Sequence, residues 1–276
     1  MNLQGKTVLI TGATDGLGKE VALMAAKDGA AVLLHGRDRA KAEPLLEAVR
    51  RAGSAGAELY LADLESLNEV RRLAEEVTAR HARLDVLINN AGILRAGDKP
   101  RAENAAGIEL HFQVNYLAPF LLTRLLLPLL KAAAPSRIVN VSSLGQSPID
   151  FEDVQLKRKY SGIQGYCQSK LAQIMFTIDL AKALAGSGVT VMSLHPATFM
   201  ATNMVVGQGL KPQSRVEDGA DATFRMAFAP EHEGETGGFY DQLKPGTPNP
   251  QASDAGARHR LWDLSEKLTG LQSQEL

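Results

Sequence analysis

The chain has 276 residues, of which 45% are hydrophobic, and its 30 basic and 31 acidic residues leave a formal net charge of -1. This length suits one large α/β domain or two small ones, and it can bury a substantial core without disulfides or structural metals. The charge balance argues against nucleic acid as the main partner. The single cysteine, Cys167, excludes an internal disulfide and fits a cytoplasmic location.

The sequence predicts no transmembrane segment. Its most apolar stretch, residues 120–130, is short and is interrupted by Arg124 and Pro128. The first residues lack the length and cleavage pattern of a signal peptide.

The first 200 residues or so alternate short apolar runs with helical patterns, which predicts parallel strands joined by right-handed helical crossovers. Runs without alternation indicate strands that are buried on both faces. The expected strands are residues 6–11, 31–34, 58–61, 85–88, 137–141 and 190–194, with a seventh at 238–240, and the expected helices are residues 18–27, 39–51, 67–81, 105–131 and 165–184. We therefore predict one Rossmann-type domain, a doubly wound parallel sheet of about seven strands with helices on both faces.

A glycine-rich turn follows the first expected strand and runs directly into a helix. Residues 11–18 read TGATDGLG, with the spacing GxxxGxG. Glycine lets the backbone approach a phosphate closely, and a helix N-terminus offers free N–H groups and a positive dipole end. Such a turn alone can be only a tight turn, but the strand before it and the helix after it favour dinucleotide binding. The residues expected at the cofactor are Gly12, Thr14, Asp15, Gly16, Leu17 and Gly18.

The end of the second expected strand bears on which cofactor binds. An acidic residue there binds the ribose hydroxyls of NAD, whereas an arginine accommodates the 2′-phosphate of NADP. Here Gly36 falls where the acid would lie, and Arg37 follows it. Arg37 could instead be a solvated loop residue, and Asp38 could simply cap the next helix. We expect NADP(H), with NAD(H) as the less favoured cofactor.

Tyr166 and Lys170 are four residues apart in an expected helix, so they share one helix face. Two charges about 5 Å apart at an effective dielectric of 20 interact by roughly 3 kcal/mol, which would lower the pKa of the phenol by about 2 units. A phenol with such a pKa can act as a general acid/base. The pair also occurs by chance, so the surrounding sequence has to decide.

Polar residues at the expected strand ends support a site near this pair. Ser142 and Ser143 close the fifth strand, and the segment NNAG at 89–92 closes the fourth. Ligands of open α/β sheets bind at this carboxyl edge. Asn115 interrupts an apolar helical segment, where it needs a buried partner or a local backbone hydrogen bond.

Taken together, these motifs resemble the classical short-chain dehydrogenase/reductase family over about residues 5–240. The matching segments are TGATDGLG at 11–18, Asp63-Leu64, NNAG at 89–92, Asn115, Ser143 and YCQSK at 166–170. The retinol-dehydrogenase-like branch resembles the chain most, through FQVNYLAPFLLT at 112–123, RIVNVSS at 137–143, YCQSKLAQIMFT at 166–177 and RLWDLSEKLTG at 260–270.

The resemblance implies hydride transfer between NADP(H) and a carbonyl or alcohol substrate. Tyr166 would donate or remove the proton, and Lys170 would lower its pKa and hold the nicotinamide ribose. Ser143 would bind the substrate oxygen, and Asn115 would support a proton-relay water. Ser143 is preferred to Ser142 because the family's catalytic serine is the second of the pair. The further cofactor contacts implied are Asp63, Leu64, Asn90, Ala91, Gly92, Pro196, Thr198 and Thr202.

The chain departs from the family pattern in two places. The usual Pro-Gly is Pro196-Ala197, and the expected hydroxyl is replaced by Ala201, which leaves Thr202 and Thr198 as alternative contacts to the nicotinamide. The segment between Ser143 and Tyr166 is long, and we interpret residues 144–163 as a lid over the substrate, the alternative being a solvent loop. Substrate specificity is expected in the segments 93–102, 144–163 and 197–215.

Several further residues are given no catalytic or ligand-binding role in this interpretation. No His, Cys and carboxylate cluster has metal-ligand spacing, so no metal is expected. Cys167 and His195 are interpreted as structural, and the basic run at 157–159 as solvated surface. The apolar run within 105–131 suggests a homodimer or homotetramer. A non-catalytic NADP(H)-binding regulator and an epimerase or dehydratase on the same fold stay open as alternatives, and the substrate is not identified.

Overall fold

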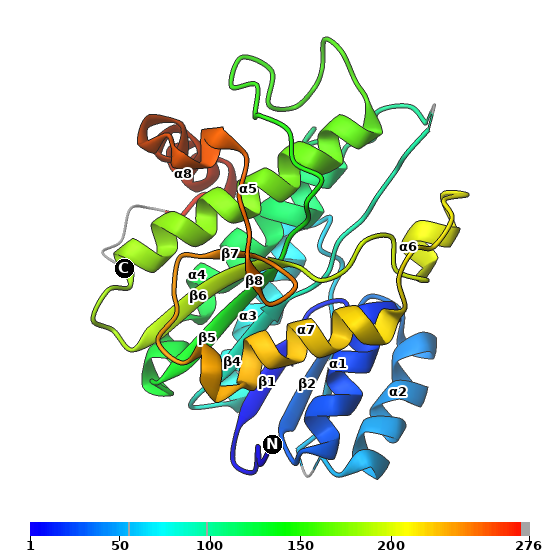
Figure 1. Cartoon of the computed structure of the whole chain (residues 1–276), viewed down its shortest axis with the longest axis vertical. Coiled ribbons are helices and arrows are strands. Elements are labelled where there is room, and N and C mark those ends of the chain that lie inside the picture. Colours follow the sequence, from blue (N-terminus) through cyan, green and yellow to red (C-terminus); the bar gives the residue numbers. More distant parts are fainter. Residues whose placement is uncertain (55, 98, 272–276) are drawn as a thin grey trace.

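The apolar runs of the sequence form the strands of one sheet in the computed structural model, which describes residues 1–54, 56–97 and 99–271. The order is β3-β2-β1-β4-β5-β6-β7-β8, and every pair is parallel except β7–β8 (Figure 1). The described strands are β1 (Thr7–Ile10), β2 (Ala31–Gly36), β3 (Glu58–Leu61), β4 (Val86–Asn89), β5 (Ser136–Val141), β6 (Val189–His195), β7 (Phe239–Asp241) and β8 (Lys244–Pro245). The predicted doubly wound sheet is confirmed, with a short antiparallel β8 added at its edge.

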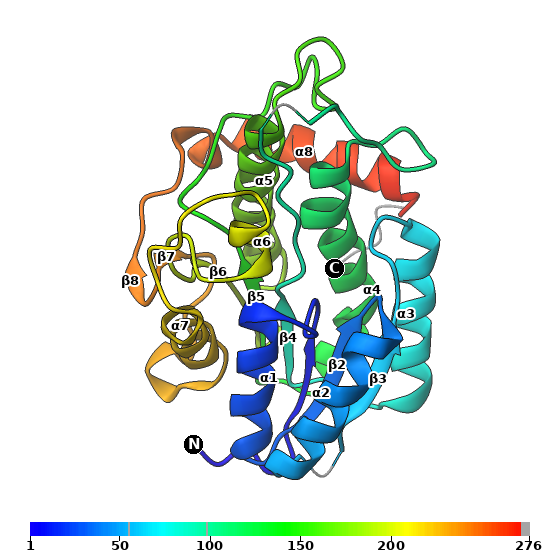
Figure 2. The same cartoon turned by 90° about the vertical axis from the view of Figure 1, so that its right-hand side faces the viewer.

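Helices cover both faces of the sheet (Figures 1 and 2). One face carries α1 (Gly16–Lys27), α2 (Arg39–Ala52) and α7 (Val216–Phe228), and the other carries α3 (Leu67–Arg80), α4 (Ala118–Ala132) and α5 (Gly162–Ala183), with α8 (Ala255–Thr269) packed on α5. Each layer buries its own hydrophobic cluster against the sheet. A short helix, α6 (Asn203–Val206), lies in the segment after β6.

Polar caps fix where several helices begin. The carboxylate of Asp38 accepts hydrogen bonds from the backbone N–H groups of Ala40 and Lys41, so the capping role considered for Asp38 is confirmed. Asp15 caps α1 by accepting from the N–H of Gly16. This cap places the start of α1 directly after β1.

The predicted helix over residues 105–131 is wrong at its start. The side chain of Asn104 accepts from the N–H groups of Ala106 and Ile108, and Gly107 has a φ of 76°, so this stretch is a turn. The helical region begins with a π-helical turn, η1 (Phe112–Leu117), which leads into α4. The carboxylate of Glu109 accepts from the N–H of Phe112 just before it.

The helix formed by η1 and α4 is buried within the fold. Residues 112–132 are long and apolar enough to cross a bilayer by length and composition, but 89% of the most apolar window is buried. Helix α8 helps to cover this region, since the Trp262 ring lies 5.4 Å from that of Phe120 and Arg124 pairs with Glu266 at 3.0 Å. The apolar run that suggested a homodimer or homotetramer is therefore packed inside one chain, and the oligomeric state stays a prediction.

Candidate active site

The glycine-rich turn after β1 is packed so tightly that side chains would not fit. A Cβ on Gly12 would lie 2.8 Å from the Cα of Ala91. A Cβ on Gly18 would lie 2.5 Å from the amide nitrogen of Asn90 and closer still to the carbonyl oxygen of Gly12. Leu17 is buried in the core beneath the turn, so only its backbone can face a ligand. The turn has the bare backbone at a helix N-terminus that phosphate binding requires.

The segment after β4 holds this turn in place. The Asn90 side chain donates to the carbonyl oxygens of Thr11 and Gly12 at 2.8 and 3.0 Å. The N–H of Ala91 donates to the hydroxyl of Thr11 at 3.0 Å. Asn90 and Ala91, expected as cofactor contacts, therefore shape the turn.

His35, at the end of β2, holds the glycine-rich turn in place and was not predicted from the sequence as a site residue. Its Nδ1 accepts from the N–H of Gly12 at 3.1 Å, so the other ring nitrogen carries the proton and donates to the carbonyl of Ala62 at 3.1 Å. Burial lowers the pKa of His35 to about 4, so the ring is neutral at physiological pH. The available signal was a histidine inside an apolar strand.

The end of β2 leaves no room for an acidic side chain. A Cβ on Gly36 would collide with the methyl group of Thr14. Arg37 is 65% exposed and lies 3.6 Å from the carboxylate of Glu65, so its guanidinium is accessible to a ligand. Asp63 accepts from the N–H of Glu65 after β3.

Leu64 belongs to the hydrophobic cluster between the sheet and the layer of α3, α4 and α5. It is buried, and its carbonyl oxygen accepts from the side chain of Gln113 at 2.8 Å. This contact ties the end of β3 to η1, which carries Asn115.

Asn115 is fully buried in the π-helical turn η1, and the predicted buried partners are present. Its side chain accepts from the N–H of Ile93 at 2.7 Å and donates to the carbonyl of Ile93 and to the hydroxyl of Ser169. Asn115 thus joins the segment after β4 to α5. Single π-helical turns are frequent at functional sites.

The two serines after β5 have different surroundings. The hydroxyl of Ser142 donates to the carbonyl oxygen of Lys170 at 2.8 Å, which fixes α5 against the end of β5. The hydroxyl of Ser143 accepts from the N–H of Gly145 at 3.0 Å and lies close enough to the Tyr166 hydroxyl to lower the pKa of that phenol. Of the two, Ser143 is therefore the one beside the phenol.

Lys170 is buried under the phenol of Tyr166, with its Nζ 5.6 Å from the centre of that ring. The ammonium donates to the carbonyl of Val141 at 2.8 Å and to the side chain of Gln173 at 3.1 Å. Burial lowers the pKa of Lys170 to about 7. A Cβ on Gly92 would lie 3.6 Å from the Nζ, so the segment after β4 meets the lysine as well.

The predicted lowering of the pKa of Tyr166 is wrong for the chain by itself. Burial raises the pKa of Tyr166, and the hydrogen bond with Ser143 offsets this only in part. The physical reason is that the same burial that surrounds the phenol also disfavours the charged form of Lys170. Gln173, which the sequence analysis missed, is a further partner of that lysine.

The two candidate threonines in the segment after β6 have different surroundings. The methyl group of Thr202 would lie 2.9 Å from a Cβ on Gly16, so Thr202 packs against the glycine-rich turn. Asn203, next to it, donates to the carboxylate of Asp15 at 2.6 Å. Thr198 is exposed, and its hydroxyl lies 3.0 Å from the Nε2 of His195.

Pro196 is buried beneath this segment, where a Cβ on Gly219 would lie 3.3 Å from it. It therefore faces α7 at this contact. Burial lowers the pKa of His195, which favours the neutral ring expected of a structural histidine.

Of the three segments in which we expect substrate specificity, 93–102 contacts each of the other two. All three lie toward the end of the molecule away from the N-terminus (Figure 2). Gln208 accepts from the N–H of Ala96 at 3.0 Å, and Arg101 donates to the carbonyl of Gln155 at 2.7 Å. Residues 144–163 are more than a solvent loop, because three of their side chains are buried, namely Ile149, Val154 and Leu156. Four large apolar side chains on these segments and at the start of α5 are exposed, namely Leu144, Ile163, Phe199 and Val206.

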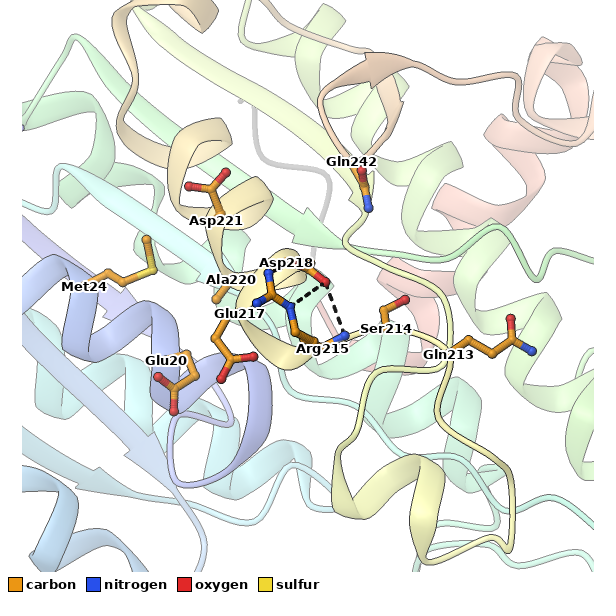
Figure 3. A pocket seen from close by; sticks show the side chains of 10 residues that line it. All are labelled: Glu20, Met24, Gln213, Ser214, Arg215, Glu217, Asp218, Ala220, Asp221 and Gln242. Atoms are coloured by element: carbon orange, nitrogen blue, oxygen red, sulfur yellow. Dashed lines mark hydrogen bonds and ion pairs between the residues drawn. The ribbon is translucent and has the colours of Figure 1, made fainter.

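Other features lie apart from this centre. A hollow of about 770 Å³ lies between α1, α7 and residues 213–215, and its rim carries acidic side chains from both helices (Figure 3). It contains none of the predicted catalytic or cofactor-binding residues, although residues 213–215 belong to the segment 197–215 in which we expect substrate specificity. In the described part of the chain, no group of three or more His, Cys, Asp or Glu residues is placed to hold a metal ion. Burial raises the pKa of the Cys167 thiol, which favours its unreactive form. Lys157, Arg158 and Lys159 are exposed, as expected of solvated surface.

A comparison with protein families agrees with this geometry. The family model described as short chain dehydrogenase matches residues 6–212. The chain belongs to the short-chain dehydrogenase/reductase family, and this membership together with its relatives supports an oxidoreductase acting on CH–OH and C=O groups.

Within the family, the chain is similar to retinol dehydrogenases. It is 40% identical to retinol dehydrogenase 13 of Mus musculus over 98% of this chain and 85% of that protein. It is 39% identical to retinol dehydrogenase 14 of Homo sapiens over 98% of this chain and 88% of that protein. The chain is thus retinol-dehydrogenase-like, as the sequence motifs predicted.

Solved structures show the same fold. An uncharacterized protein from Mycobacterium paratuberculosis superposes with a TM-score of 0.79 at 33% identity, covering 98% of this chain and 95% of that one. The RhlG/NADP active-site complex of Pseudomonas aeruginosa superposes with a TM-score of 0.70 at 27% identity, covering 87% of this chain and 95% of that one.

The packing around Gly18 predicts the effect of one added methyl group. Gly18→Ala forces the Cβ into Gly12 and Asn90, so we expect the free energy of unfolding to fall by about 1–3 kcal/mol, as for other overpacked sites. The affinity for NADPH should fall as well, because the turn has to open. Urea unfolding and fluorescence titration measure the two effects.

Gly256→Ala serves as the control, because a Cβ there would meet only the carboxylate of Asp254, at 3.3 Å. Its stability should stay near that of the parent protein. Normal stability and normal NADPH affinity in Gly18→Ala would contradict the tight turn described above.

Proposed function

We propose that this protein is an NADP(H)-dependent oxidoreductase that interconverts an aldehyde or ketone with an apolar body and the corresponding alcohol. The observation that carries the proposal is the convergence of Ser143, Tyr166, Lys170 and Asn115 at the carboxyl edge of the sheet, beside a glycine-rich turn. The exposed apolar side chains around this centre favour the apolar substrate.

The residues present fit a dinucleotide. Bare backbone at the start of α1 suits a pyrophosphate, and Gly92 lies beside the Nζ of Lys170, where the nicotinamide end would be held. The cofactor, when bound, supplies the hydride, and the chain supplies binding and proton transfer. Thr202 is the better placed of the two threonines for a cofactor contact, because it lies against the glycine-rich turn.

The proton chemistry belongs to Tyr166. Since burial raises its pKa, its hydroxyl is protonated at neutral pH and can donate a proton to a substrate oxygen. Ser143, beside it, can hydrogen-bond the same oxygen. Lys170, with a pKa of about 7, exists in both protonation states at neutral pH and can exchange a proton near the phenol.

The preference for NADP(H) rests on the end of β2. Thr14 occupies the space that an acidic side chain at Gly36 would need, and the exposed guanidinium of Arg37 makes a long ion pair, 3.6 Å, with Glu65. A 2′-phosphate can replace that carboxylate through charge-assisted hydrogen bonds.

Tyr166→Phe tests the acid/base role. It removes one hydroxyl and keeps the packing, so we expect a loss of about 10²–10⁴-fold in kcat from the missing proton transfer. NADPH affinity should change little. Steady-state kinetics on the best aldehyde and a cofactor titration give both values. A variant that keeps most of its activity would reopen the epimerase and regulator alternatives.

Arg37→Met tests the cofactor preference. Losing a charge-assisted contact costs about 1.5–3 kcal/mol, so NADPH affinity should fall by roughly 10- to 150-fold while NADH affinity stays nearly constant. Arg50→Met, at the far end of α2 and 50% exposed, controls for the loss of one surface charge. Equal affinity of the unmodified protein for NADPH and NADH would rule the preference out.

A further inference from the structure

We propose that Arg95 and Tyr160 form a subsite for a carboxylate on the substrate, so that the favoured substrate is an oxo acid or hydroxy acid with an apolar chain between its two ends. The inference rests on the proposed function, because it describes the distal end of the molecule on which Tyr166 acts.

The two residues lie at the start of α5, although they are far apart in sequence. The hydroxyl of Tyr160 would be 3.6 Å from a Cβ on Gly162, and the carbonyl oxygen of Arg95 would collide with the same Cβ. Gly162 precedes Tyr166 by four residues on one face of α5, a rise of about 6 Å. Gly162, beside which the Tyr160 hydroxyl and the Arg95 backbone lie, is therefore about one helical turn from Tyr166.

Both side chains have a buried polar atom without a partner. The Nε of Arg95 and the hydroxyl oxygen of Tyr160 are buried and make no hydrogen bond within residues 1–54, 56–97 and 99–271. Burial and the charge of Glu109 raise the pKa of Tyr160, whereas the charges of Arg95 and Arg101 lower it, so Arg95 is close enough to act on the Tyr160 hydroxyl. Unpaired buried donors are costly, which indicates that an acceptor binds there.

Glu109, whose charge acts on Tyr160, does not serve as that acceptor. One carboxylate oxygen of Glu109 lies 2.6 Å from the Nδ1 of His111, and the other accepts from the N–H of Phe112 at 2.9 Å. Both oxygens are thus engaged by other donors.

Arg101, in the same segment as Arg95, has a guanidinium whose contacts are made within the protein. Its guanidinium donates to the carbonyls of Gln155 and Gly107 and pairs with Glu103. Arg95 makes no such contact with a described residue, although its backbone N–H is held by His111 at 3.0 Å. The backbone is fixed and the guanidinium is left for a ligand.

The chemistry of the two donors selects a carboxylate. A guanidinium binds a carboxylate through two parallel N–H···O bonds, and the phenol adds a third donor. A neutral carbonyl could accept from these donors but would not balance the charge of the guanidinium. Ile163, exposed in the turn between Gly162 and Tyr166, supplies an apolar surface for the carbon chain that joins the two ends.

The experiment compares ω-oxo acids of increasing chain length with their methyl esters as substrates for NADPH oxidation. We expect the acid to have the higher kcat/KM at one preferred length. Arg95→Met should lower the acid-to-ester ratio of kcat/KM by about 10- to 100-fold, the range of a charge-assisted contact. Tyr160→Phe should lower it less, in the same direction.

Lys159→Met is the matched control, because it removes an equal charge from an exposed residue beside Tyr160 and should leave the ratio unchanged. Calorimetry on the NADP⁺ complex, with the saturated fatty acid of the same length and its ester, gives a readout that needs no turnover. There the acid should bind more tightly, and Arg95→Met should remove the difference.

The outcomes separate the two proposals. Efficient turnover of acids and esters with a ratio near one, or a ratio that Arg95→Met does not change, overturns the subsite and leaves the proposed function standing. Tight binding of the acid through Arg95 without turnover of any carbonyl supports the subsite and overturns the proposed function. Equal binding of acid and ester in calorimetry overturns the subsite whatever the kinetics show.

Discussion

A lysine ammonium buried at the carboxyl edge of the sheet is the constraint around which this site is built. Lys170 is 3% exposed and is held by the carbonyl of Val141 and the side chain of Gln173. Its pKa falls from 10.5 to about 7, so between these pH values the folded chain binds fewer protons than the unfolded chain. The free energy of unfolding therefore rises with pH between about pH 7 and 10.5. Burying the charged lysine destabilises the fold most below about pH 7. Ser142, bonded to the carbonyl of the lysine, helps to keep α5 in this position.

The rest of the site connects this lysine to the glycine-rich turn. The segment after β4 is shared by both, because Asn90 shapes the turn and Gly92 lies beside the lysine. His35 fixes the turn from the other side as a neutral ring. A displacement of this segment would therefore disturb the cofactor end and the proton-transfer end together.

Local patterns in the sequence predicted most of the fold and the residues that meet at the site. The spacing of Tyr166 and Lys170, and polar residues directly after apolar strands, depend only on neighbouring residues and on sheet topology. Contacts and burial that depend on the folded chain could not be predicted from the sequence. The helix start was misplaced because Asn104 closes a turn, and the direction of the pKa shift of Tyr166 was wrong because burial cannot be read from sequence. The approach of Arg95 and Tyr160 to Gly162, at the start of α5, likewise could be seen only in the structure.

A pH titration of isotopically labelled lysine side chains by NMR tests the central claim most directly. The account predicts one lysine signal that titrates near pH 7 and is missing in Lys170→Met. The Lys170 ammonium should lose its proton as the pH rises through about 7, because burial disfavours the charged form. A Lys170 signal that titrates near the ordinary lysine value of 10.5 would contradict the buried ammonium described above.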